Sequence, residues 1–100
     1  MYRMNRRLIV HSEAETEILQ ALTWYGERSR VAARAFVQEL TNMVTLATRS
    51  PESWPRTYGN TRQIVFPRFP FNLVFRMRGE TIEIVAVAHQ RRRPSYWHNR

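Results

Sequence analysis

The sequence predicts an α+β fold in which a two-helix hairpin packs on one face of a small, mainly antiparallel sheet. Apolar residues recur with a helical period in two stretches between residues 12 and 48, and the period changes to two from residue 62 onward. A Gly-Glu pair at residues 79 and 80 then separates two alternating segments, as in a β-hairpin. The element order is therefore β-α-α-β-β-β. A chain of 100 residues predicts a single domain over residues 1–100.

The first strand and the first helix are predicted from residues 8–26. Residues 8–10 form a short β-prone run. Ser12, with Glu15 three residues later, has the pattern of a capping box and predicts the start of a helix, which Gly26 ends. The apolar stripe of this helix comprises Ala14, Ile18, Ala21, Leu22 and Tyr25. Three acidic residues lie in the first turns, where the helix dipole favours negative charge: Glu13, Glu15 and Glu17.

A second helix is predicted over residues 29–48, and the short polar link around Gly26 predicts an antiparallel helical hairpin. Its apolar stripe comprises Ala33, Phe36, Val37, Leu40, Val44 and Ala47. Residues 50–60 are rich in Pro and Gly and predict a loop. We expect Leu40 of this helix and Phe75 of the sheet to lie in the core.

Three strands are predicted over residues 62–66, 71–78 and 82–89, with a type II′ turn at Gly79-Glu80. The turn sets a register that places Arg76 opposite Glu83 as an ion pair. The same register pairs Phe75 with Ile84, Leu73 with Ala86, and Met77 with Ile82. In this register, the apolar face of the sheet packs against the two helices. The other face is expected to be open, half polar and available to a ligand, and to present Asn72, Val74, Arg76, Val85, Val87 and His89.

The charge is carried by sixteen Arg and no Lys against eight Glu, which gives a net charge of +8. This excess predicts an acidic partner such as nucleic acid, a ribosome or an acidic protein. The absence of Cys excludes disulfides and thiolate metal sites, and three His residues without zinc-motif spacing predict no metal and no cofactor. No apolar run is long enough for a membrane span, so we expect a soluble intracellular protein with no membrane partner.

The candidate functional residues cluster after the last strand. His89 ends that strand, Arg91 and Arg92 follow, and Tyr96 returns after a proline. An imidazole and a phenol that transfer protons, beside guanidinium groups that hold a phosphate, could cleave RNA without a metal. Arg76 and Arg93 add to the phosphate-binding charge. The alternative is structural: His89 ends a strand, the Arg run contacts a partner, and Tyr96 and Trp97 fold the tail back as an aromatic lid.

The element order, the segment "RFPFNLVFR" and the ending "IEIVAVAHQRRRPSYW" resemble the RelE/ParE superfamily of type II toxins over almost the whole chain. The resemblance implies a small cytoplasmic bacterial toxin, of a kind often described as a plasmid-stabilisation protein. It also implies a cognate acidic antitoxin and a toxin–antitoxin hetero-oligomer. RelE-like members cleave mRNA on the ribosome, whereas ParE-like members inhibit DNA gyrase and are not enzymes.

The residues of this chain match both branches in part. Tyr96 and a basic residue at Arg91 or Arg92 match the RelE-like pattern. Asn72 stands where that pattern has Arg, and Arg62 replaces the usual Lys in charge. His89 before a basic tail matches the ParE-like pattern. The function predicted is growth inhibition, by ribosome-dependent mRNA cleavage or alternatively by inhibition of gyrase. A third hypothesis is a chain that is no longer toxic and serves only as an antitoxin partner or co-repressor.

Overall fold

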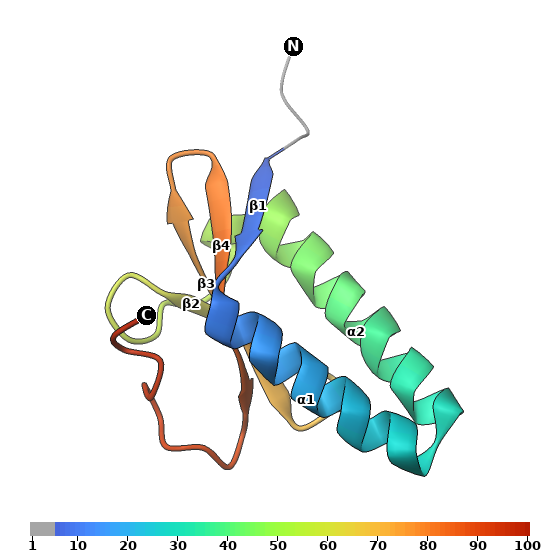
Figure 1. Ribbon diagram of the computed structural model, residues 1–100. Coiled ribbons are helices and arrows are strands. Elements are labelled where there is room, and N and C mark those ends of the chain that lie inside the picture. Colours follow the sequence, from blue (N-terminus) through green and yellow to red (C-terminus); the bar gives the residue numbers. More distant parts are fainter. Residues whose placement is uncertain (1–5) are drawn as a thin grey trace.

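A two-helix hairpin packs on one face of a four-stranded sheet in the computed structural model, which describes residues 6–100 (Figure 1). The elements are β1 (Arg7–Val10), α1 (Ser12–Arg28), α2 (Arg30–Arg49), the 3₁₀ turn η1 (Pro51–Ser53), β2 (Arg62–Val65), β3 (Phe71–Arg78) and β4 (Thr81–His89). The predicted fold class and element order are confirmed.

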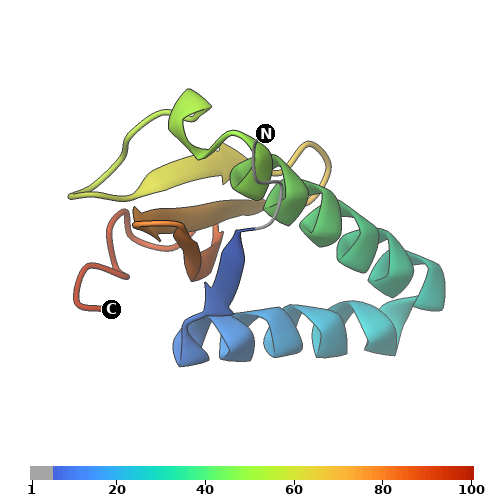
Figure 2. The same ribbon diagram turned by 90° about the horizontal axis from the view of Figure 1, so that it is seen from above.

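The strand order in the sheet is β1-β4-β3-β2. The strands β2, β3 and β4 pair antiparallel, while β1 pairs parallel to β4 and reaches it only over residues 81–84. Beyond Ile84, the edge of β4 lies beside α1 instead of a strand, and His11 donates its backbone N–H to the Ile84 carbonyl as the chain turns into that helix (2.9 Å). Figure 2 shows the helices diverging from their junction at residues 28–30, with the sheet across their open ends.

The helix boundaries differ from the prediction at α1. His11, and not Ser12, caps this helix, because its Nδ1 accepts the backbone N–H of Glu13 at 3.1 Å. The helix continues past Gly26 to Arg28, so Gly26 does not end it. Ser29 ends the helix: its N–H bonds to the Tyr25 carbonyl, and its hydroxyl accepts the N–H of Ala32 to cap α2. A residue with a capping side chain therefore marks the break between the helices.

The core between the sheet and the helices is built around aromatic rings. Phe36 is fully buried and contacts four other rings: Tyr25, Phe66, Phe69 and Phe71. Phe75 is fully buried, which confirms the prediction, and Leu40 packs partly buried against this core. The predicted stripe of α2 is wrong at Val37, which is 44% exposed, while Met43 is buried. The buried face of α2 passes through Phe36, Met43 and Ala47.

One acidic residue, Glu39, is buried on the same helix face and holds the connector between β2 and β3. Its carboxylate accepts the backbone N–H groups of Arg68 (2.9 Å) and Phe69 (3.1 Å) and the Arg68 Nε (3.2 Å). Burial by itself would raise the pKa of Glu39, but these hydrogen bonds and the Arg68 charge outweigh it and lower the pKa. Glu39 is therefore a charged anchor that orders residues 68 and 69.

The β3–β4 hairpin contains a bulge that the sequence analysis did not predict. Gly79 has a φ of 60°, as the first central residue of a type II′ turn requires, and Arg76 pairs with Glu83 as predicted. Phe75 pairs with Ile84, but Val74 pairs with Ala86, so Val85 is an extra residue. The predicted pairing of Leu73 with Ala86 is therefore wrong, and Leu73 faces Val87.

The bulge changes which side chains face outward. Val87, predicted on the open face, belongs to the core beneath the helices, whereas Val85, Ala86 and Ala88 form a second apolar cluster with Val74. Trp97 covers this second cluster and is 6% exposed. The predicted open, half-polar face is thus wrong, because the chain after β4 folds back and closes it. Trp97, with Tyr96 beside it, forms the aromatic lid that we gave as the structural alternative to a catalytic tail.

Candidate functional site

The segment after β4, residues 90–100, is called the tail here and forms one wall of the candidate site. It leaves the sheet through a turn in which Arg92 donates its N–H to the His89 carbonyl (2.9 Å) and Gln90 donates to the Pro70 carbonyl (2.9 Å). Ser95 then adopts a left-handed φ of 62°, which redirects the chain and brings Trp97 onto the sheet. A tight backbone path therefore sets the direction of the side chains that follow the Arg run.

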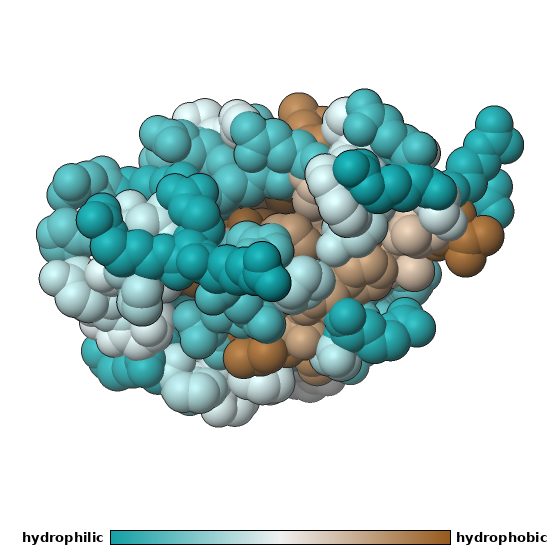
Figure 3. Space-filling view, turned by 90° about the horizontal axis from the view of Figure 1, so that it is seen from below, coloured by the Kyte–Doolittle hydropathy of each residue, from teal (hydrophilic) through white to brown (hydrophobic). Residues whose placement is uncertain are grey.

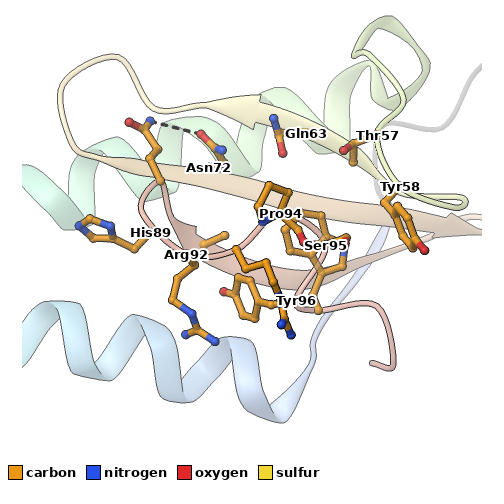
Figure 4. A pocket seen from close by; sticks show the side chains of 13 residues that line it. Thr57, Tyr58, Gln63, Asn72, His89, Arg92, Pro94, Ser95 and Tyr96 are labelled. Atoms are coloured by element: carbon orange, nitrogen blue, oxygen red, sulfur yellow. Dashed lines mark hydrogen bonds between the residues drawn. The ribbon is translucent and has the colours of Figure 1, made fainter.

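A hollow of about 400 Å³ lies between the tail and the strands, and we call it the tail hollow (Figure 4). Its lining comes from the loop before β2, from β2, β3 and the end of β4, and from the tail: Thr57, Tyr58, Gln63, Asn72, Ala88, His89, Gln90, Arg92, Arg93, Pro94, Ser95, Tyr96 and Trp97. Two guanidinium groups and several amides line it, and no lining residue is acidic. This composition suits an anionic or hydrogen-bond-accepting group.

His89 stands where β4 meets the tail and lines the tail hollow. Its ring is half-buried and packs edge-on against Phe71, with ring centroids 5.2 Å apart. The Nδ1 atom accepts the backbone N–H of Arg91 at 3.1 Å, so this nitrogen carries no proton in the hydrogen-bonded form. The contact uses one ring nitrogen to hold the turn and leaves Nε2 for other contacts.

Tyr96 is tied to the first helix. Its hydroxyl donates to Oε2 of Glu17 at 2.6 Å, and the Arg92 guanidinium lies over its ring, 3.8 Å from the centroid. Burial raises the pKa of Tyr96 far above its usual value, and the hydrogen bond and charge of Glu17 raise it further against the opposing charges of Arg100 and Arg92. The phenol is therefore a firmly protonated donor, and its proton already has an acceptor.

The other predicted site residues lie in three different settings. Arg93 lines the tail hollow with Arg92, and Arg91 is exposed beside it without lining it. Arg76 is half-buried: its Nε bonds to Glu83 Oε1 at 2.7 Å. Arg62 bonds through Nη1 to the carbonyl oxygen of Trp54 at 2.7 Å. The structure thus gathers His89, Arg92, Arg93 and Tyr96 at one hollow, and it places Arg62 and Arg76 in structural contacts outside the lining.

Sequence reasoning missed the role of Glu17 and the contributions of Gln63 and Tyr58 to the hollow. A signal for Glu17 was present. Glu17 follows Ala14 by three positions and precedes Ala21 by four, so it lies on the buried stripe of the helix. Its place in the first turns, where the helix dipole favours negative charge, is therefore not its only distinction. No comparable signal marks Gln63 or Tyr58, because they reach the hollow only through the packing of β2 and its preceding loop against the tail.

A second, more apolar hollow of about 300 Å³ lies beside α1, and His89 borders it as well. Its lining is Ala21, Trp24, Tyr25, Pro70, Phe71 and His89. Figure 3 shows apolar residues gathered around a depression in the face seen from below, with hydrophilic residues around them. His89 therefore stands between a cationic hollow and an apolar one.

Two further properties concern only the part of the chain that the structure describes. In residues 6–100, no three His, Cys, Asp or Glu side chains come together as a set of metal ligands. None of the helices in that range is both long enough and apolar enough to cross a membrane.

Comparisons with known proteins assign the chain to a family. Residues 8–94 match the family described as "ParE toxin of type II toxin-antitoxin system, parDE". The chain is 27% identical over 97 residues to Toxin ParE2 of two strains of Mycobacterium tuberculosis, covering 92% of this chain and 89% of the relative. The fold is similar to a solved chain of the chromosomal ParDE toxin–antitoxin system from P. aeruginosa, with a TM-score of 0.73 and 19% identity, covering 87% of this chain and 98% of that chain. The chain therefore belongs to the ParE family and is a toxin of a type II toxin–antitoxin system, which implies an antitoxin partner.

Proposed function

We propose that this toxin arrests growth by binding DNA gyrase and not by cleaving mRNA. The observation that carries the proposal is that several side chains needed for RNA cleavage are already bound within the fold. Membership of the ParE family, whose resemblance implied gyrase inhibition, supports the same choice.

The proton-transfer groups are the first part of this argument. A general base must accept a proton and a general acid must deliver one to substrate. Tyr96 donates to Glu17 at 2.6 Å, and its raised pKa makes it a poor base near neutral pH. His89 accepts a backbone N–H through Nδ1, so only its Nε2 remains for proton transfer to or from a substrate.

The phosphate-binding groups are the second part. Arg76 is held by Glu83 and by the Arg100 carbonyl oxygen (2.8 Å), and its side chain is 12% exposed. Arg62 is held by backbone carbonyls of the preceding loop. By contrast, Arg91, Arg92 and Arg93 are exposed, and such a run suits contact with an acidic protein surface.

The same excess of positive charge supports an acidic antitoxin that forms a hetero-oligomer with this toxin. We propose that the complex lies in the cytoplasm, where gyrase is found. A gene pair of this kind would stabilise a plasmid that carries it.

The test is expression of the toxin without antitoxin, followed by labelling of DNA and protein synthesis. Our proposal predicts that DNA synthesis stops first, that purified toxin stabilises gyrase cleavage complexes, and that mRNA on ribosomes stays intact. The double variant Arg92→Gln/Arg93→Gln should weaken gyrase inhibition about tenfold or more. The matched control is Arg49→Gln/Arg56→Gln, which removes the same charge from two exposed sites and should inhibit like the wild type.

The second candidate function is ribosome-dependent mRNA cleavage, and one observation favours it. His89, Arg92, Arg93 and Tyr96 line a single cationic hollow large enough for a nucleotide. Cleavage of ribosome-bound mRNA by the wild type, lost in His89→Ala and Tyr96→Phe, would replace the gyrase proposal with this one. Normal growth on expression without antitoxin would instead favour a chain that is no longer toxic.

A further inference from the structure

The Glu17 carboxylate on α1 uses both of its oxygens to hold the tail and the sheet together. Oε1 accepts the backbone N–H of Val87 (2.9 Å) and Nη1 of Arg100 (3.1 Å). Oε2 accepts the Tyr96 hydroxyl (2.6 Å) and Nη2 of Arg100 (2.9 Å). The side chains of Glu17 and Arg100 are each 11% exposed, so this two-point ion pair is largely shielded from water.

The position of Glu17 follows from the way the sheet ends. β1 pairs with β4 only as far as Ile84, and past that point a helix, whose backbone groups bond within itself, lies along the strand edge. Glu17 supplies the acceptor that the Val87 N–H would otherwise find on a neighbouring strand. Arg100 supplies the matching donor, because its Nη1 bonds to the Val85 carbonyl at 3.1 Å. These two side chains replace a missing strand at the bulge.

A second contact holds the tail to the sheet at its C-terminal end, after Trp97. The Arg76 Nη2 donates to the Arg100 carbonyl oxygen at 2.8 Å, while Glu83 holds the same guanidinium through Nε. Trp97 lies between these fixed points and is buried, although within residues 6–100 no hydrogen-bond partner reaches its Nε1. An unsatisfied buried donor opposes burial, and this cost is offset by the apolar burial of the Trp97 ring together with the polar contacts of Tyr96 and Arg100.

The contacts continue from Tyr96 to the basic run. Arg92 stacks on the Tyr96 ring at 3.8 Å, and Arg91 is tied to His89 through its backbone N–H. The placement of the Arg92 guanidinium therefore depends on Tyr96, whose backbone N–H also bonds to the Arg93 carbonyl at 3.3 Å. The placement of Tyr96 in turn depends on Glu17.

We propose that Glu17 is a positioning residue for the toxin's target-binding tail: it touches no target itself and fixes the direction in which Arg92 and Arg93 are presented. This inference rests on the proposed function, in which that basic run meets gyrase. It predicts that the tail can be released from the sheet without unfolding the helical hairpin.

The first arm of the test contains no gyrase and measures amide hydrogen exchange of the full chain. His98 and Arg100 donate their backbone N–H groups to Ser95 and Trp97, so their protection reports the tail. In Glu17→Gln we expect these amides to exchange at least about tenfold faster, with α2 and β3 unchanged. The matched control is Glu15→Gln, an exposed position on the same helix with the same charge change, and it should exchange like the wild type.

The second arm compares gyrase inhibition by the same proteins. Glu17→Gln should inhibit at least about tenfold more weakly while keeping its affinity for the antitoxin, and Glu15→Gln should match the wild type. A merely structural role would instead weaken inhibition and antitoxin binding together and accelerate exchange throughout the chain. Should Glu17→Gln not fold, Tyr96→Phe removes one donor of the cluster and should release the tail to a smaller extent.

Three results would overturn the proposal: an unchanged tail exchange rate, a released tail with full inhibition, or exchange that rises equally in every element. If the wild type does not inhibit gyrase, the proposed function fails. The exchange arm still decides whether Glu17 holds the tail.

Discussion

On the face toward α1 and α2, the sheet is covered by large rings, and Phe36 contacts four other aromatic side chains there. On the face toward the tail, it is covered by a small cluster of Val and Ala side chains beneath Trp97. The first face is held chiefly by buried apolar area. The second depends on charged side chains: Glu17 with Arg100, and Glu83 with Arg76.

This difference separates the part of the chain that maintains the fold from the part that presents the basic surface. Apolar burial is not directional and survives changes of pH. A shielded ion pair is directional, and loss of one partner leaves the other unpaired. We therefore expect substitutions beneath the helices to unfold the chain, and substitutions beneath the tail to affect the tail first.

The largest effect is expected beneath the helices. Phe36→Ala removes a fully buried ring and should reduce the free energy of unfolding by about 4 kcal/mol, close to the whole stability of a small domain. Urea denaturation followed by circular dichroism measures this loss. A loss below about 1 kcal/mol would contradict the view that the aromatic cluster dominates the fold.

The next largest effect tests the charged face. Arg76→Gln leaves Glu83 buried without its closest cation and should cost about 3 kcal/mol. Arg78→Gln is the matched control, because Arg78 lies 3.7 Å from the same carboxylate but is 63% exposed, and its loss should cost less than about 0.5 kcal/mol. Urea denaturation measures the free energy of unfolding of both variants. Equal losses would show that the burial of Arg76 does not strengthen its contact with Glu83.

Glu39 tests whether a single buried charge contributes to the stability of the apolar face. Its pKa is lower in the folded chain than its ordinary value of 4.5, so its contribution is complete above that pH and is lost as the pH falls through the folded pKa. Glu39→Gln should cost about 2 kcal/mol at pH 7, and the difference from the wild type should shrink at pH values below about 4. Urea denaturation at both pH values measures this. A difference that stays constant would rule out the charge as the source of the stability.

The smallest effect concerns the hydroxyl that joins the tail to α1. Tyr96→Phe should cost about 1.5 kcal/mol, since it removes one hydrogen bond to a carboxylate and keeps the ring beneath Arg92. Tyr58→Phe is the control on a half-exposed ring and should be neutral in the same denaturation experiment. If Tyr96→Phe is also neutral, the Tyr96 hydroxyl contributes nothing measurable to holding the tail.

Much of the fold followed from periodicity and from local signals. The helical stripes, the β-prone and alternating runs and the Gly79-Glu80 turn predicted both helices and all four strands, but not the 3₁₀ turn η1. They also predicted the pairing of Arg76 with Glu83. The candidate site was predicted in part: His89, Arg92, Arg93 and Tyr96 line one hollow, while Arg62 and Arg76 support the fold. The extra residue Val85 was not predictable, because its neighbours are apolar on both sides and either alternation satisfies the pattern.

The sequence by itself determined the helices, the strands, the positive charge and the family to which the chain belongs, because each depends on residue types at short or regular spacing. Only the tertiary structure decided what the charges do. An Arg side chain can reach an acidic partner where it is exposed, as at Arg93, and it supports the fold where a carboxylate and a carbonyl oxygen accept its hydrogen bonds, as at Arg76. That outcome depends on contacts such as Glu17 with Tyr96, seventy-nine positions apart, and no local pattern specifies them.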